Sequence, residues 1–159
     1  TIADINQDNI NRVLSYGPAS VVPTQQIHST ECDIFSPCAL GGGLNDSSLP
    51  EIKASIIAGA ANNQLESEGI HDEMLRQRGI LYAPDYVINA GGIISIESEI
   101  YKEKLDDGAR LAKVLRIGET LTSIFKESDK QKLPTGIIAN EMAENIIAKA
   151  KENKKASAA

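Results

Sequence analysis

Short apolar runs alternate with amphipathic segments through the first half of the chain. The apolar runs predict strands at residues 1–5, 20–22, 32–35, 54–58 and 80–83. Helical spacing of apolar residues predicts helices at residues 8–16 and 71–78, and a single turn at 49–52. This order is typical of a parallel sheet covered by helices, and the handedness of such crossovers favours a doubly wound α/β sheet.

The pattern changes to helices alone after Gly92. Residues 93–101, 109–127 and 137–151 have the helical spacing of apolar positions. The second of these helices is predicted to bury a face formed by Leu111, Val114, Leu115, Gly118, Leu121, Thr122 and Phe125. The third is predicted to be capped by Thr135 and to place Ile138, Met142, Ile146 and Lys149 along one side. The chain therefore divides into residues 1–92 and residues 93–159.

Composition and charge exclude several classes of protein. The 159 residues are 42% hydrophobic and 24% charged, as in ordinary globular domains. A net charge of −6 predicts no nucleic-acid partner, and no apolar run reaches the roughly 18 residues of a membrane span. Cys32 and Cys38 are too few for a disulfide scaffold and lack zinc-site spacing, so we expect reduced thiols, no metal and a cytoplasmic location. His28 and His71 are predicted to be surface residues.

The end of the first predicted strand carries an acidic residue, Asp4. In a dinucleotide-binding sheet, a carboxylate at such a strand end accepts hydrogen bonds from the adenosine ribose hydroxyls and repels a 2′-phosphate, which favours NAD over NADP. Many strands end in Asp for other reasons, so Asp4 alone is weak evidence. The glycine fingerprint expected about twenty residues earlier is absent, because the chain begins at Thr1 inside a predicted strand. Gly41–Gly43 does not replace it, and we expect a fragment.

Two further strand ends carry groups suited to a flat polar ligand. After residues 32–35, a Pro-Cys break leads into Gly41–Gly43, where backbone can approach a ring closely. Cys38 is interpreted as a small buried thiol rather than a nucleophile, since no His is near in sequence. After residues 54–58, Asn62 and Asn63 offer carboxamide donors and acceptors, although surface turns also favour such pairs.

The last strand end combines a buried-looking amide with the start of a helix. Asn89 precedes Gly91-Gly92, and buried amides must be hydrogen-bonded. The free N–H groups at a helix start favour a carboxylate or phosphate. Ile93 and Ile96 lie one turn apart and are predicted to line an apolar pocket, with ordinary core packing as the alternative.

Three segments together resemble the leucine dehydrogenases and, more broadly, the glutamate/leucine/phenylalanine/valine dehydrogenase superfamily. They are CDIFSPCALGG at 32–42, IAGAANNQL at 57–65 and YAPDYVINAGG at 82–92. The resemblance covers essentially the whole chain and implies an incomplete Rossmann-like sheet that lacks its first strand and glycine loop, followed by C-terminal helices packing back across a cleft. It implies no catalytic residue in this chain, because the family's catalytic Lys and Asp belong to a preceding domain.

The same resemblance implies NAD-dependent oxidative deamination of an L-amino acid to its 2-oxo acid. The implied cofactor-binding residues are Asp4, Ile5, Cys38, Ala39, Leu40, Asn62, Asn63 and Asn89, and the implied substrate-pocket residues are Ile93, Ile96 and Asn89. The family also implies a homo-oligomer.

The identity of the substrate is left open by departures from the family's usual residues. Val is common where Ile93 and Ile96 stand, and Asn where Ser95 stands. Branched-chain amino acids are the expected substrates, with a phenylalanine or tryptophan dehydrogenase as the alternative. A non-catalytic nucleotide-binding or assembly module is the alternative from another class. The chain by itself is expected to be inactive.

Overall fold

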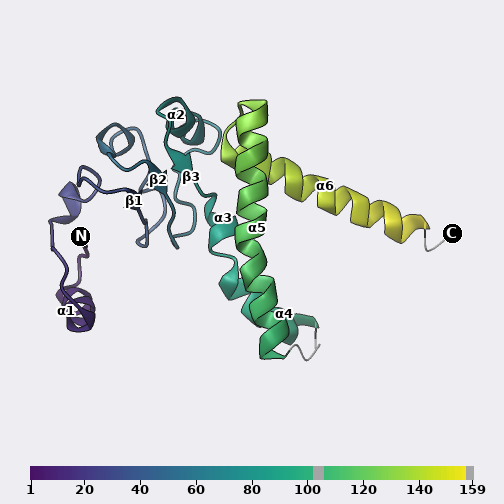
Figure 1. Ribbon diagram of the computed structural model, residues 1–159, viewed down its shortest axis with the longest axis horizontal. Helices are drawn as coiled ribbons and strands as arrows, with labels where there is room; N and C mark the ends of the chain where they lie inside the picture. The colour runs from purple at the N-terminus through teal and green to yellow at the C-terminus, as the bar shows by residue number, and fades with distance from the viewer. Residues whose placement is uncertain (102–105, 157–159) are drawn as a thin grey trace.

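Three short parallel strands form the centre of the first half of the protein (Figure 1). The computed structural model describes residues 1–101 and 106–156. The strands are β1 (Ile34–Phe35), β2 (Ile56–Ile57) and β3 (Leu81–Tyr82), in the order β1-β2-β3. Each is shorter than the predicted strand that contains it, but the parallel α/β arrangement is confirmed. The prediction of a doubly wound, incomplete Rossmann sheet stays a prediction.

The two predicted strands nearest the N-terminus are wrong as strands, because each contributes only one bridge. Ile2 pairs in parallel with Val21, through bonds of 2.8 Å from the Ile2 N–H to the Ser20 carbonyl and 3.0 Å from the Val22 N–H to the Ile2 carbonyl. Little apolar surface is buried here, since Ile5 is 95% exposed and Val21 is 46% exposed. The pairing therefore stops after one residue on each side.

The predicted helices of the first half are confirmed within a residue or two. They are α1 (Gln7–Tyr16), the 3-10 turn η2 (Leu49–Glu51) and α2 (His71–Gln77). Helix α1 begins where the side chain of Asn6 accepts a hydrogen bond from the Asp8 N–H, at 2.8 Å. A second 3-10 turn, η1 (Thr24–Gln26), and a short helix, α3 (Asp85–Ile88), were not predicted.

One apolar cluster holds the sheet against α2 and η2. Its buried members are Leu44, Leu49, Ile52, Ala54, Ile57, Leu65, Leu75, Ile80 and Tyr82. Ile57 of the middle strand is completely buried, as is Leu75 of α2. Removing such side chains from water supplies most of the stabilisation of a sheet this short.

The second half consists of α4 (Gly91–Tyr101), α5 (Asp107–Gln131) and α6 (Thr135–Ala156). A smaller cluster of Ile124, Ile138 and Ala139 joins α5 to the start of α6, with Val87 of α3 packed against it. Helix α5 lies beside α3 and α4, while the distal part of α6 extends away from the other elements (Figure 1). The helical prediction for this half is confirmed.

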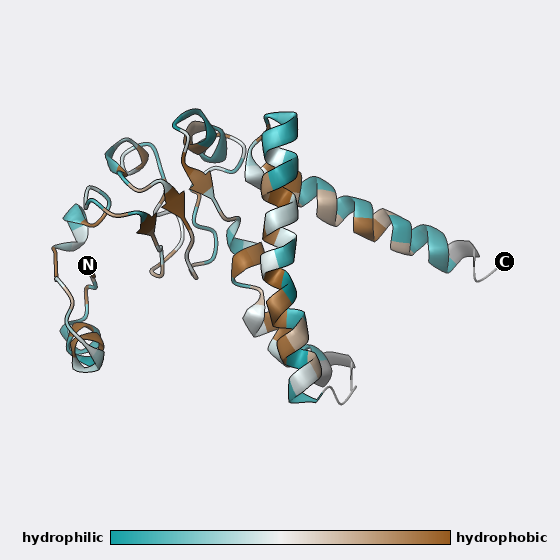
Figure 2. Cartoon of the chain, in the orientation of Figure 1, coloured by the Kyte–Doolittle hydropathy of each residue, from teal (hydrophilic) through white to brown (hydrophobic). Residues whose placement is uncertain are grey.

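The predicted buried face of α5 is wrong for four of its seven members, because Leu111, Leu115, Gly118 and Thr122 are exposed. Leu111 is 58% exposed and Leu115 is 67% exposed, whereas Ile124, which was not predicted, is buried. Periodicity finds an apolar face but does not show how far along it the neighbouring elements reach. The same is true of α6, where Ile138 is buried but Ile146 is 67% exposed. Figure 2 shows apolar turns on α6 beyond its contact with α5.

Thr135 is the first residue of α6 and does not cap it, contrary to the prediction. Its hydroxyl instead donates to the backbone carbonyl of Tyr82, at 2.7 Å, and so ties the helix to the end of β3. We expect Thr135→Val to lower the free energy of unfolding by about 1 to 3 kcal/mol, because a buried carbonyl loses its donor. Urea denaturation measures this cost.

The control for this prediction is Thr122→Val in α5. The Thr122 hydroxyl is exposed and donates only to the Gly118 carbonyl of its own helix, at 2.8 Å. If both variants lost the same stability, the contact between Thr135 and Tyr82 would contribute nothing specific.

Candidate functional site

The loops that follow β1 and β2 are in direct backbone contact. The Ala61 N–H donates to the Pro37 carbonyl at 2.9 Å. A Cβ added to Gly59 would lie 2.2 Å from the Pro37 carbonyl oxygen and 2.5 Å from its ring nitrogen. Only glycine fits at Gly59 without moving the neighbouring backbone, so the carboxyl ends of two strands are held as one unit.

The glycine run after β1 is explained in part by the protein's own packing. A Cβ added to Gly41 would lie 2.8 Å from the carbonyl oxygens of both Asn62 and Asn63. The Gly42 N–H donates to the Asn63 carbonyl at 2.7 Å, and Gly42 has a left-handed φ of 72°. The approach of backbone to backbone therefore requires Gly41, independently of any ligand.

The three residues between Pro37 and Gly41 are exposed at the end of β1. Cys38 and Ala39 are exposed, and Leu40 is 90% exposed. The interpretation of Cys38 as a buried thiol is therefore wrong. The chain turns at Pro37, whose carbonyl is bonded to the next loop, and this leaves Cys38 on the surface with the Ser36 hydroxyl 3.5 Å from its sulfur.

Two predicted site residues from different strand ends meet through their side chains. The Asn89 side-chain N–H donates to the Asn62 side-chain oxygen, with 2.6 Å between Nδ2 and Oδ1. Asn62 is exposed and Asn89 is half-buried. The bond leaves the Asn62 amide nitrogen and the Asn89 amide oxygen without a protein hydrogen bond among the described residues. The pair therefore offers one donor group and one acceptor beyond the carboxyl ends of β2 and β3.

Asn63 has a different role from its neighbour Asn62. Its φ of 51° is left-handed, a conformation that Asn adopts more readily than most residues. Its carbonyl accepts the bond from Gly42, so Asn63 fixes the path of the loop, and its exposed side chain does not join the Asn62–Asn89 pair.

The Asp4 carboxylate is exposed and already structured by the start of α1. Oδ1 accepts from the Asn6 N–H at 2.8 Å, and Oδ2 accepts from the Asn9 side-chain amide at 3.1 Å. These two bonds, the first above all, hold the pKa of Asp4 below its usual value. Asp4 is therefore a fixed anion at neutral pH, and Ile5 beside it is exposed.

The two predicted pocket residues lie in the first turns of α4, which begins at Gly91. Ile93 is 65% exposed and Ile96 is 47% exposed, whereas Ile94 between them is half-buried. This exposure contradicts the alternative that both are ordinary core residues of the described chain. They form an open apolar face next to Asn89, the residue that follows α3.

Sequence reasoning missed the importance of Gln64, which holds the Asn62–Asn63 loop in place. Gln64 is 1% exposed, and its side-chain nitrogen donates to the carbonyls of Gly59 and Ala61, both at 2.9 Å. Its backbone N–H donates to the Asp85 carboxylate at 3.2 Å. The signal in the sequence is the position of Gln64, a third amide directly after Asn62 and Asn63, which could have been predicted to be buried.

The prediction that His71 is a surface residue is wrong. His71 is 2% exposed, and its Nδ1 accepts from the Ser67 N–H at 3.0 Å. Nε2 therefore carries the proton and donates to the Asp46 carboxylate at 3.1 Å. At the start of α2 both ring nitrogens are thus hydrogen-bonded, one to the Ser67 N–H and one to the Asp46 carboxylate. These two bonds allow the ring to be buried although its neighbours in the sequence are polar.

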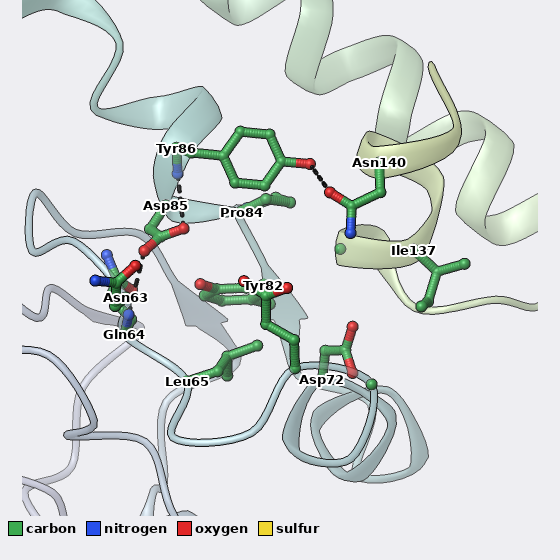
Figure 3. A pocket seen from close by; sticks show the side chains of 13 residues that line it. Asn63, Gln64, Leu65, Asp72, Tyr82, Pro84, Asp85, Tyr86, Ile137 and Asn140 are labelled. Atoms are coloured by element: carbon green, nitrogen blue, oxygen red, sulfur yellow. Dashed lines mark hydrogen bonds between the residues drawn. The ribbon is translucent and has the colours of Figure 1, made fainter. Parts of the chain in front are cut away.

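A pocket lies at the seam between β3, α3 and the start of α6 (Figure 3). The Tyr86 hydroxyl donates to the Asn140 side chain across it, at 2.7 Å. Burial raises the pKa values of both Asp72 and Tyr82. The packing is tight, because a Cβ added to Gly136 would lie 2.8 Å from an Asp72 carboxylate oxygen. The pocket is therefore mainly a packing seam.

Two kinds of feature are missing from the described part of the chain. No group of three His, Cys, Asp or Glu residues there could hold a metal ion. None of the helices described is both long enough and apolar enough to cross a membrane.

Comparisons with known proteins identify the relatives of this chain. The family model for glutamate/leucine/phenylalanine/valine dehydrogenase matches residues 2–155. L-tryptophan dehydrogenase from Nostoc punctiforme is 43% identical over 153 residues, which cover 96% of this chain and 43% of that protein. Leucine dehydrogenase from Bacillus cereus is 39% identical over 153 residues, which cover 96% of this chain and 41% of that protein.

A solved structure extends the likeness from sequence to fold. The crystal structure of L-tryptophan dehydrogenase from Nostoc punctiforme has a TM-score of 0.87 at 43% identity, covering 94% of this chain and 44% of that one. The chain thus spans less than half the length of these relatives. The match over nearly all of its residues shows that the chain belongs to the glutamate/leucine/phenylalanine/valine dehydrogenase family.

Proposed function

We propose that the protein is an NAD-dependent amino-acid dehydrogenase and that this chain supplies its cofactor-binding part. The reaction converts an L-amino acid, water and NAD⁺ into the 2-oxo acid, ammonium, NADH and a proton. The observation that carries the proposal is the bond between Asn62 and Asn89 beyond the carboxyl ends of adjacent parallel strands, in a chain of this family. Ligands of open parallel sheets bind at that edge.

The residues present fit a dinucleotide. The Asp4 carboxylate has four lone-pair positions, of which protein donors use two, so two remain for the hydroxyls of the adenosine ribose. Ile5 lies beside that ribose. Asn62 and Asn63 meet the nicotinamide ribose or its carboxamide, and the exposed Cys38, Ala39 and Leu40 border the nicotinamide side. When bound, NAD accepts the hydride that leaves the substrate's α-carbon.

The substrate lies against the first turns of α4. Asn89 orients the substrate or the nicotinamide edge, and Ile93 and Ile96 contact the substrate side chain. Their exposed branched carbons support a branched-chain amino acid, namely leucine, isoleucine or valine. An aromatic substrate is the second candidate, supported by the 43% identity to an L-tryptophan dehydrogenase.

The remaining parts of the proposal concern the whole protein. Residues 1–92 act as the partial NAD-binding Rossmann domain, and residues 93–159 pack back across the cleft. The catalytic Lys and Asp belong to a domain outside this chain, so the chain alone turns over no amino acid. The complete protein is a homo-oligomer of the cytoplasm.

The direct test assays the product of the complete reading frame with NAD and L-leucine, L-phenylalanine or L-tryptophan, following the absorbance of NADH. We expect turnover by the complete product and none by residues 1–159 alone. Robust turnover by the isolated chain would contradict the proposal that the catalytic Lys and Asp belong to another domain. No turnover by the complete product would contradict the proposed reaction.

Cofactor choice is expected to depend on Asp4. In the complete protein, Asp4→Ala removes the anion that binds the ribose hydroxyls and repels a 2′-phosphate, so kcat/KM with NAD falls and the ratio of NADP to NAD rises about tenfold. The control is Asp33→Ala, an exposed carboxylate next to the opposite end of β1. Equal ratios in both variants and the parent would show that Asp4 does not determine the choice of cofactor.

A further inference from the structure

The Asp4 carboxylate is held on both of its oxygens before any ligand arrives. The Asn6 N–H binds Oδ1, and the Asn9 side chain reaches back from the first turn of α1 to bind Oδ2, at 3.1 Å. A bond to only one oxygen leaves rotation about Cβ–Cγ free, whereas bonds to both fix the plane of the carboxylate. Asn9 is therefore the side chain that determines the direction of the two remaining lone pairs.

The orientation of the Asn9 amide is itself determined by a neighbour. The Arg12 guanidinium donates to the Asn9 side-chain oxygen at 3.4 Å, one turn along α1. Because that oxygen accepts from Arg12, the amide nitrogen must face Asp4. Asn9 is half-buried, while Asp4 and Arg12 are exposed on either side of it. The three side chains form a row of anion, amide and cation.

We infer that Asn9 is a positioning residue that makes the protein select NAD over NADP. The inference rests on the proposed cofactor role of Asp4. Asn9 aims the carboxylate at the paired ribose hydroxyls and at the same time occupies Arg12. Without Asn9 the carboxylate rotates, and Arg12 is released close to the place where a 2′-phosphate would lie. A guanidinium there is a typical partner of that phosphate.

The test compares Asn9→Ala with the parent in the complete protein, using NAD and NADP in calorimetric binding. We expect NAD to bind about tenfold more weakly in Asn9→Ala, the effect of one bond to a charged group, and the NADP-to-NAD affinity ratio to rise. Asn9→Ala combined with Arg12→Ala should lose the gain in NADP affinity. Asn11→Ala is the matched control, since Asn11 is exposed on the same helix and bonds only to Gln7.

A readout independent of binding is the NMR titration of the Asp4 carboxyl group. Its pKa should rise in Asn9→Ala and stay unchanged in Asn11→Ala. Asn9→Ser, which keeps a short donor, should be intermediate in both measurements and serves if Asn9→Ala does not fold.

The outcomes separate the inference from the proposed function. If Asp4→Ala weakens NAD binding but Asn9→Ala and Asn9→Ser do not, the inference is overturned while the cofactor role of Asp4 stands. If even Asp4→Ala leaves NAD binding unchanged, the proposed ribose site is wrong and the inference is overturned with it. Weaker NAD binding, a higher NADP-to-NAD affinity ratio and a raised Asp4 pKa together support the inference, whereas an unchanged ratio overturns it.

Discussion

Gly59→Ala is expected to disrupt the strand-end region and to lower the free energy of unfolding by about 3 kcal/mol, the upper end of the usual cost of overpacking. The new methyl carbon would lie 2.2 Å from the Pro37 carbonyl oxygen and 2.5 Å from the Pro37 Cδ and N atoms. These are atoms of backbone and ring, which cannot rotate away as the end of a flexible side chain can. Relief therefore requires the two loops to separate, which breaks the bond from the Ala61 N–H to Pro37.

The measurement is urea denaturation followed by circular dichroism, with Gly17→Ala as the matched control. Gly17 follows α1, and nothing lies within 4 Å of the position that its Cβ would take. The same chemical change should therefore cost nearly nothing there. In the complete protein, Gly59→Ala should also abolish NAD binding, because Asn62 follows on the displaced loop. Stability within about 0.5 kcal/mol of the control would show that the loops yield easily.

The strands of the sheet could be predicted because their sequences determine burial locally. Ile56 and Ile57 lie in an apolar run bounded by Gly59, and parallel strands covered by helices give such runs. Ile34 pairs with Ile56 and Ile56 pairs with Leu81, in the parallel arrangement that the alternation of strands and helices predicts. The first predicted strand failed because Ile5 has no apolar partner to cover it.

Features that depend on distant contacts could not be predicted from local patterns. The burial of His71 depends on Ser67 and on Asp46, 25 residues away in sequence. The exposure of Leu115 depends on where α3 and α4 end along α5, which no periodicity within α5 can reveal. The need for glycine at Gly41 follows from its close contact with the backbone of residues 62–63, which only the structure shows.

Only part of the candidate site could be predicted from the sequence. Asn62 and Asn89 were each predicted from strand ends, and the parallel topology explains why they meet. The residues that hold the site act through side-chain bonds, from Gln64 to the carbonyls of Gly59 and Ala61 and from Asn9 to the Asp4 carboxylate. Their side chains resemble ordinary polar surface residues in the sequence, so only the structure identifies them.

The largest expected change in substrate preference comes from the double variant Ile93→Ala with Ile96→Ala in the complete protein. Both side chains are exposed on one face of the first turns of α4, next to Asn89. A pocket wall discriminates by about 1 to 3 kcal/mol for each methylene-sized difference. Removing these two branched side chains should therefore shift the phenylalanine-to-leucine ratio of kcat/KM toward phenylalanine by about 10- to 100-fold. Steady-state kinetics on both amino acids measures the ratio.

The matched control is Ile146→Ala with Ile147→Ala, which removes the same atoms from a comparably exposed part of α6. Ile146 and Ile147 are 67% and 53% exposed, against 65% and 47% for Ile93 and Ile96. The α6 pair should leave the ratio unchanged because no site residue lies on that part of the helix. An unchanged ratio in the α4 variant as well would place the side-chain pocket outside this chain. A parent that already favours phenylalanine or tryptophan would overturn the branched-chain assignment, and the proposed dehydrogenase reaction would stand.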